Sequence, residues 1–182
     1  MNRVGIALFA AGILLLSGGA AMAHRLDEYL HAATLDLTRT HILLHLRLTP
    51  GVDVADGIIR QMDRNSDGHL SPIEQRAYVS QIMQGLSLSL NGRAARLRVE
   101  ALTFPTIAEM RAGTGVIDLR FSVKTGLQTG SYRLTYRDRG AGTGTVWLIN
   151  CLLPQDPAIH VTRQKRSEDQ SSYMLDFSIS PP

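Results

Sequence analysis

LDLTRTHILLHLRL, residues 35–48, alternates apolar and polar side chains on both sides of a short polar connection. Alternation with a period of two places one set of side chains on each face of a β-strand. The apolar set consists of Leu35, Leu37, Ile42, Leu44, Leu46 and Leu48. We therefore expect two strands joined at residues 39–41, each with one face in a hydrophobic core.

Strand patterns of the same kind recur along the rest of the chain. The expected strands are 86–90, 97–99, 116–123, 132–136, 145–153, 159–163 and 173–179. Asn91-Gly92 is a strong hairpin turn signal, and the glycine-rich segments 126–130 and 140–144 mark further turns. Segment 140–144 lies between two strands, which disfavours a phosphate-binding loop. Eight or nine short strands in this arrangement indicate a mainly β fold, an antiparallel β-sandwich of the Ig-like type.

A change of period interrupts the strands between Val52 and Met83. Apolar residues recur there at helical spacing, first before residue 63 and again after residue 74. These residues are Ala55, Ile58, Ile59 and Met62, then Tyr78, Val79, Ile82 and Met83. The pattern predicts a helix, a loop and a helix, inserted at 52–84 into a single domain of residues 24–182.

The loop between the two expected helices has a spacing that suits a hard cation. Its sequence from Asp63 to Glu74 fits the pattern D-x-[DN]-x-[DN]-G-x5-E at every specified position. Carboxylate and amide oxygens at positions one, three and five point inward as the chain curls, and Gly68 allows the sharp turn. An acidic turn followed by a Ser-x-x-Glu helix cap would share part of this pattern without any metal.

These residues resemble the EF-hand family of calcium-binding proteins. The resemblance implies Ca²⁺ as the bound ion and a single ligand set, with His69 contributing its backbone carbonyl. The implied ligands are Asp63, Asn65, Asp67, His69, Ser71 and Glu74. EF-hands usually occur in pairs, and this sequence has one loop. A structural or interaction role is therefore expected rather than a sensor role, with a homodimer through the lone loop or an unidentified protein as the possible partner.

The first residues have the pattern of a secretory signal peptide. A basic start at Arg3 precedes an apolar run from Val4 to Leu16, and Ala21-Met22-Ala23 offers small residues for cleavage after Ala23. We expect a periplasmic or secreted protein, attached to a membrane only if this segment is retained. The chain is also similar to a group of exported bacterial proteins without an assigned function, on segments such as 24–30, 48–51 and 150–157.

The new amino terminus at His24 gives an alternative metal site. Its α-amino group and imidazole could chelate copper. In this one respect the sequence resembles exported copper carriers and copper-dependent polysaccharide monooxygenases, so a carrier or oxidase is the alternative function. A third nitrogen would come from one of the histidines His31, His41, His45 and His160.

Charge and composition narrow the remaining classes. The net charge is +3, too small a bias to indicate nucleic acid. Cys151 is the only cysteine, so no internal disulfide can form. No residue spacing indicates an enzyme. The basic cluster Arg163-Gln164-Lys165-Arg166 fits either partner recognition or a solvated strand end.

Overall fold

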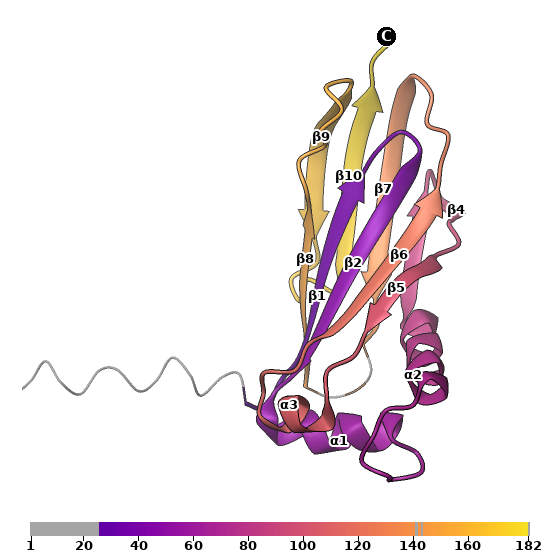
Figure 1. The fold of residues 1–182 in the computed structure, drawn as a ribbon. Helices are drawn as coiled ribbons and strands as arrows, with labels where there is room; N and C mark the ends of the chain where they lie inside the picture. Colours follow the sequence, from indigo (N-terminus) through magenta and orange to yellow (C-terminus); the bar gives the residue numbers. More distant parts are fainter. Residues whose placement is uncertain (1–25, 141, 143, 182) are drawn as a thin grey trace, which may run out of the picture.

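A computed structural model describes residues 26–140, 142 and 144–181, and these residues form mainly β-strands (Figure 1). The expected signal peptide and His24 lie outside the described residues. The elements are β1 (Tyr29–Leu37), β2 (His41–Pro50), α1 (Val52–Met62), α2 (Pro72–Gly85), β3 (Leu86–Leu90), β4 (Arg93–Ala94), β5 (Arg98–Thr103), α3 (Ile107–Arg111), β6 (Ile117–Lys124), β7 (Gly130–Asp138), β8 (Thr145–Cys151), β9 (Ile159–Arg166) and β10 (Ser172–Ile179).

The strands form two five-stranded sheets, an arrangement compatible with a β-sandwich. Their orders are β5-β6-β2-β1-β8 and β4-β3-β7-β10-β9. Every described pair is antiparallel except β1 with β8, which is parallel. The expectation of a purely antiparallel arrangement is therefore corrected for this pair. Strand β8 follows β7, which belongs to the other sheet, so the chain crosses between the sheets before β8 begins. No tight turn joins β8 to β1, and the two strands are therefore free to run parallel.

The inner faces of the two sheets meet in one hydrophobic core. Burial alternates residue by residue along β1, β2 and β10, as the period of two predicts. One cluster of buried side chains joins both sheets and the helices; its fully buried members include Leu35, Leu46, Leu48, Met110, Ile117, Leu119, Leu134 and Leu175. The core thus occupies the space between the sheets and extends under the helices.

The segment after Asn91-Gly92 departs from the simple hairpin expected there. Both turn residues have positive φ, 51° and 77°, as the tight turn requires. The returning strand β4 spans only two residues, and the chain then crosses to the other sheet, where β5 pairs with β6. Ala95 and Leu97 pack against the core during this crossing, which brings the chain over the open edge between the sheets.

The short helix α3 was not predicted from the sequence. Thr106 and Glu109 form a capping box at its start, and Ile107 and Met110 are buried. The helix packs against α1, and Figure 1 shows α1, α2 and α3 at one end of the sheets. The spacing Thr106-x-x-Glu109 is the local signal that could have indicated this helix.

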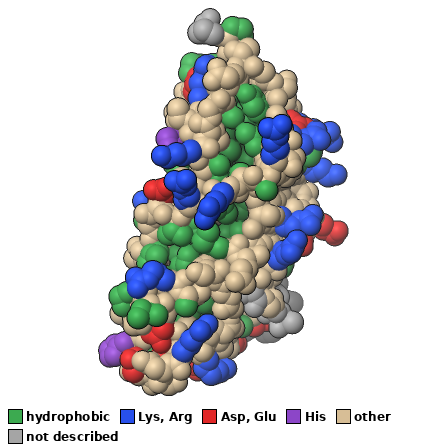
Figure 2. Space-filling model, turned by 90° about the vertical axis from the view of Figure 1, so that its right-hand side faces the viewer, with side chains coloured by type: hydrophobic (Ala, Val, Ile, Leu, Met, Phe, Trp, Pro, Cys, Tyr) green, Lys and Arg blue, Asp and Glu red, His purple; other side chains and the backbone are tan. Residues whose placement is uncertain are grey.

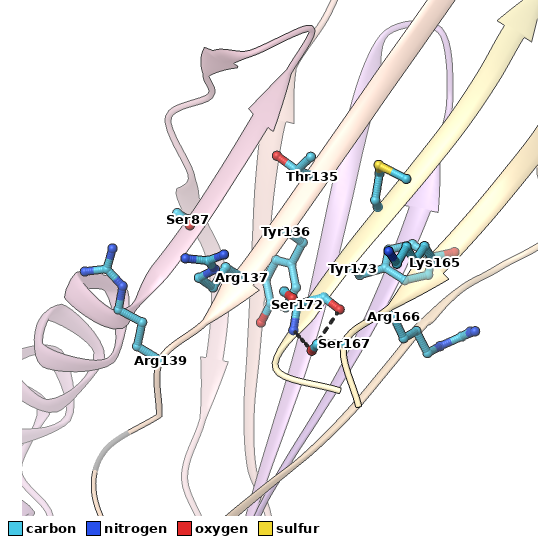
Figure 3. A pocket seen from close by; sticks show the side chains of 11 residues that line it. Ser87, Thr135, Tyr136, Arg137, Arg139, Lys165, Arg166, Ser167, Ser172 and Tyr173 are labelled. Carbon is cyan, nitrogen blue, oxygen red and sulfur yellow. Dashed lines mark hydrogen bonds between the residues drawn. The ribbon is translucent and has the colours of Figure 1, made fainter. Parts of the chain in front are cut away.

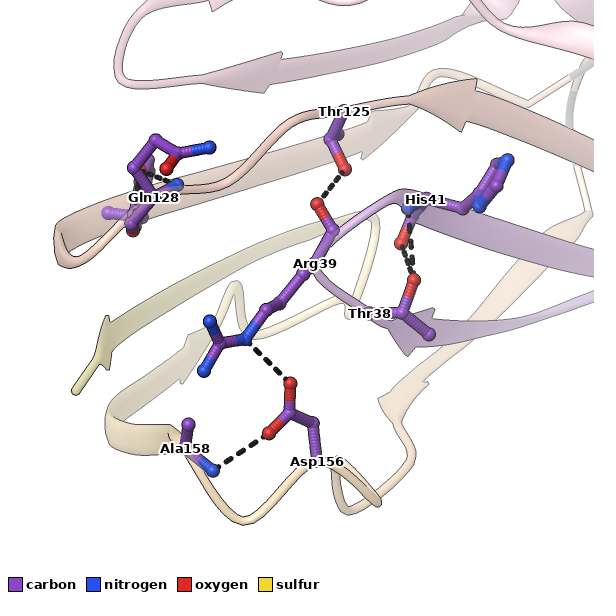
Figure 4. Close-up of polar contacts among 8 residues, drawn as sticks. Thr38, Arg39, His41, Thr125, Gln128, Asp156 and Ala158 are labelled. Carbon is purple, nitrogen blue, oxygen red and sulfur yellow. Dashed lines mark hydrogen bonds and ion pairs between the residues drawn. The ribbon is translucent and has the colours of Figure 1, made fainter. Parts of the chain in front are cut away.

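Loops at the opposite end of the sheets are tied together by polar contacts (Figure 4). Arg39, in the β1–β2 turn, forms an ion pair with Asp156 at 2.8 Å, and Asp156 also accepts a bond from the Ala158 amide at 2.9 Å. The Thr125 hydroxyl donates to the Arg39 carbonyl at 3.0 Å. These contacts hold three loops from distant parts of the sequence at the end remote from the helices.

Candidate metal centre

The loop 63–74 is held between two helices whose inner faces join the core. Helix α1 buries Ala55, Ile58, Ile59 and Met62, and α2 buries Tyr78, Val79 and Ile82. Helix α1 ends where the Asp63 amide donates to the Ile59 carbonyl at 2.8 Å. The sequence prediction of a helix, a loop and a helix between the second and third strands agrees with this element order.

Asp63, the first residue of the loop, is turned into it. Its carboxylate accepts hydrogen bonds from the Asp67 amide at 3.2 Å and from the Gly68 amide at 3.0 Å. Gly68 has φ of 80°, a conformation that a side chain would oppose, and Ser66 also has a positive φ of 56°. Asp63 is only 7% exposed, so these amides fix the orientation of a nearly buried carboxylate.

Asn65 and Asp67 interact with each other on the exposed side of the loop. The Asn65 side-chain amide donates to Asp67 Oδ2 at 2.8 Å, and the Asp67 backbone amide donates to Asn65 Oδ1 at 3.1 Å. The His69 backbone amide donates to Asp67 Oδ1 at 2.9 Å. Side-chain oxygens at positions three and five are thus both engaged with donors of the loop itself.

Glu74, the twelfth residue, connects the start of α2 to the beginning of the loop. Its Oε2 accepts bonds from the Ser71 amide at 2.9 Å and the Ser71 hydroxyl at 2.7 Å, and its Oε1 accepts from the Arg64 amide at 3.0 Å. These bonds, chiefly those from Ser71, hold the pKa of the Glu74 carboxyl below its usual value. The helix cap anticipated as the metal-free explanation is therefore present, and Glu74 also reaches back across the loop.

The oxygens of the loop face amide donors rather than one another. Among the described residues, no group of three or more His, Cys, Asp or Glu side chains is placed to hold a metal ion. The carboxylates of Asp63, Asp67 and Glu74 also form no ion pair with any lysine or arginine in the described ranges. The side chains of the loop expected to bind a metal offer only oxygen atoms as ligands, and oxygen ligands suit a hard cation such as Ca²⁺.

A buried polar cluster, missed by sequence reasoning, links α2 to both sheets. The hydroxyls of Tyr29 and Tyr78 are 2.7 Å apart, and His31 Nδ1 is 2.7 Å from Asp138 Oδ2. Asp138 Oδ1 also accepts from the Gly140 amide at 2.7 Å. The inward position of His31 in the β1 alternation was the available signal, but its partner lies 107 residues away.

Three of the histidines considered for a copper site make different contacts, and the fourth, His160, is exposed on β9. His31 is 1% exposed and paired with Asp138, and His45 pairs with Asp118 at 2.7 Å on the other side of the same sheet. His41 contacts the Thr40 hydroxyl in the β1–β2 turn. Because His24 is outside the described residues, the copper hypothesis stays a prediction.

The fold and the loop together define a mainly β protein with two antiparallel-rich sheets and a helix-loop-helix segment between β2 and β3. No protein family, curated protein or solved structure matches the chain. In the part of the chain that the structure describes, no helix has both the length and the apolar character needed to cross a bilayer.

Proposed function

We propose that the loop from Asp63 to Glu74 binds one Ca²⁺ ion, and that the helical hairpin is an EF-hand inserted into an Ig-like β-sandwich. The observation that carries this proposal is the position of the first and last loop residues. Asp63 and Glu74 are 7% and 8% exposed, and both carboxylates accept hydrogen bonds from backbone amides of the loop between them. The two ends of the twelve-residue loop thus point their oxygens toward its interior.

The charge of the loop supports a cation as its ligand. Asp63, Asp67 and Glu74 place three carboxylates within twelve residues, and no described lysine or arginine pairs with them. Like charges at short range repel one another, and a divalent ion would reduce this repulsion. Ca²⁺ suits the set better than Mg²⁺, because it accepts more oxygen ligands in a flexible geometry.

The hydrogen bonds of Glu74 indicate weak binding. A carboxylate has about four lone-pair positions, and three of those of Glu74 are used by Ser71 and Arg64. Both positions on Oε2 are occupied, so bidentate coordination requires the Ser71 contacts to loosen. This competition favours an affinity near the 10⁻⁴ to 10⁻³ M typical of extracellular calcium modules.

A weak single site in an exported protein is suited to a structural role. At ten times its dissociation constant, calcium would add about 1.4 kcal/mol to the free energy of unfolding. Tyr78 connects α2 to β1, so order gained in the loop would be passed to the core. We infer a structural or interaction module located in the periplasm or outside the cell.

Calorimetric titration of Ca²⁺ into the chain beginning at His24 tests this proposal. Glu74→Gln should abolish binding, because glutamine can still form the helix cap but lacks the bidentate carboxylate. Glu109→Gln is the matched control, since Glu109 makes the same capping box with Thr106 outside any acidic loop. One-to-one binding lost only in the Glu74 variant is the expected result. No heat in the parent chain, or equal binding by the Glu74 variant, would refute the site.

A further inference from the structure

A basic groove of about 540 Å³ lies on the second sheet, on the side facing away from β1 and β2 (Figure 3). Residues from β3, β7, β9 and β10 line it. Figure 3 shows Arg137 and Arg139 on the β7 side, Lys165 and Arg166 on the β9 side, and Ser172 between them. Lys165 and Arg166 belong to the basic cluster that the calcium proposal leaves without a role.

Strand register places these side chains in ordered rows across the sheet. Ser87, Arg137 and Ser172 are direct cross-strand partners on three neighbouring strands. Thr135, Met174 and Lys165 form the next row in the same way. Neighbouring strands are about 4.8 Å apart, so the backbones of β7 and β9, separated by β10, lie roughly 10 Å apart.

The cations of the groove are free to bind an anion. Arg137, Arg139 and Lys165 form no ion pair among the described residues, and no acidic residue lines the groove. Arg166 is held in place instead, because it donates to the Ile149 carbonyl at 2.8 Å and lies over the Tyr173 ring at 5.2 Å. The groove therefore presents uncompensated positive charge on a rigid surface of paired strands.

Hydroxyl groups accompany the positive charges. Ser87, Thr135, Ser167 and Ser172 all line the groove. The Thr135 hydroxyl bonds to the Ser89 hydroxyl and the Ser167 hydroxyl donates to Asp169, whereas Ser87 is exposed and its hydroxyl has no partner among the described residues. A hydroxyl both donates and accepts hydrogen bonds, so such a surface can bind the hydroxyl groups of a sugar as well as its anionic substituents. This combination of groups distinguishes the groove from a purely electrostatic patch.

We propose that this groove binds a linear glycan that carries sulfate or carboxylate groups. Cations on two strands about 10 Å apart can contact successive charges along a polymer, whereas a single small anion would reach only one of them. The aromatic rings in the groove do not favour nucleic acid, because Tyr136 and Tyr173 are each 2% exposed and offer no stacking platform. None of the large apolar side chains exposed in the described ranges lines the groove, which disfavours insertion into a bilayer.

The test compares two double variants that remove the same charge from different faces. Arg137→Gln with Lys165→Gln changes the groove, whereas Arg93→Gln with Arg98→Gln changes the side of the molecule that carries β4 and β5. Figure 2 shows that side, where lysine and arginine side chains also surround apolar surface. All four residues are exposed, so both double variants should fold normally, which circular dichroism would verify.

Binding of fluorescent dextran sulfate is measured with a chelator present, so that calcium cannot bridge protein and glycan. We expect the groove variant to lose at least about tenfold in affinity and the control variant less than about threefold, with no binding of uncharged dextran. Equal losses in the two variants, or no binding by the parent chain, would overturn the proposal. Tighter binding of single-stranded DNA or of phosphatidylglycerol vesicles, lost in the groove variant, would overturn the assignment to a glycan.

Discussion

Replacing Tyr78 by phenylalanine removes one hydroxyl from the contact that joins α2 to β1. The hydroxyls of Tyr78 and Tyr29 are 2.7 Å apart, and the two residues are 1% and 3% exposed. Among the described residues, each hydroxyl has the other hydroxyl as its only hydrogen-bond partner. Phenylalanine would keep the ring contacts of Tyr78, including the edge contact with Phe104 at 6.4 Å.

The magnitude of the loss follows from leaving one buried hydroxyl without a partner. An unsatisfied buried polar group costs about 1–3 kcal/mol, so Tyr78→Phe and Tyr29→Phe should each lower the free energy of unfolding by that amount. The double variant leaves neither hydroxyl behind and should lose only about 0.5–1.5 kcal/mol. The double-mutant cycle should therefore give a coupling of at least about 0.5 kcal/mol.

Urea unfolding followed by circular dichroism measures these changes. With a slope of about 2 kcal/mol per molar urea, a loss of 2 kcal/mol moves the midpoint by about 1 M. Tyr132→Phe is a control, because the Tyr132 hydroxyl bonds to the exposed Gln128 backbone, where water can replace it. Additive losses in the Tyr29 and Tyr78 variants, or single losses no larger than in the control, would refute the buried pair.

Three further changes have defined outcomes. His31→Leu should cost about 3–5 kcal/mol in urea unfolding, because it leaves the Asp138 carboxylate buried without its ionisable partner; a loss below about 1 kcal/mol would contradict the pair. Burial raises the pKa of Tyr78 to about 12, so the folded state keeps its proton where the unfolded state, near pKa 10, releases it. The contribution of Tyr78 to the free energy of unfolding should thus be complete below pH 10 and be lost as the pH rises to 12. The fall of stability with pH should be less steep in Tyr78→Phe, and an unchanged slope in this variant would argue against the raised pKa of Tyr78. A chelator added to protein that is held in calcium at ten times its dissociation constant should lower the melting temperature by about 3–6 °C. Glu74→Gln should eliminate this shift, and Glu109→Gln should retain it.

Local patterns predicted most of the elements because each depends on residues close together in the sequence. Alternation in 35–48 predicted β1 and β2, and helical spacing around the loop predicted α1 and α2. Asn91-Gly92 forms the expected turn since its two residues tolerate positive φ. The five-residue helix α3 escaped prediction because it is too short to show a period, although its capping residues are readable.

Within the candidate metal centre, the sequence by itself determined the order of the oxygen donors, the turn at Gly68 and the helix start at Ser71, all of which depend on neighbours within a few residues. Tertiary structure alone decided that β8 runs parallel to β1, that β5 crosses to the other sheet, and that Arg137 and Lys165 share a groove. It also decided the pairing of His31 with Asp138 across the core. Such contacts join residues far apart in the chain, and the choice among partners depends on how whole faces pack together, which no local pattern records.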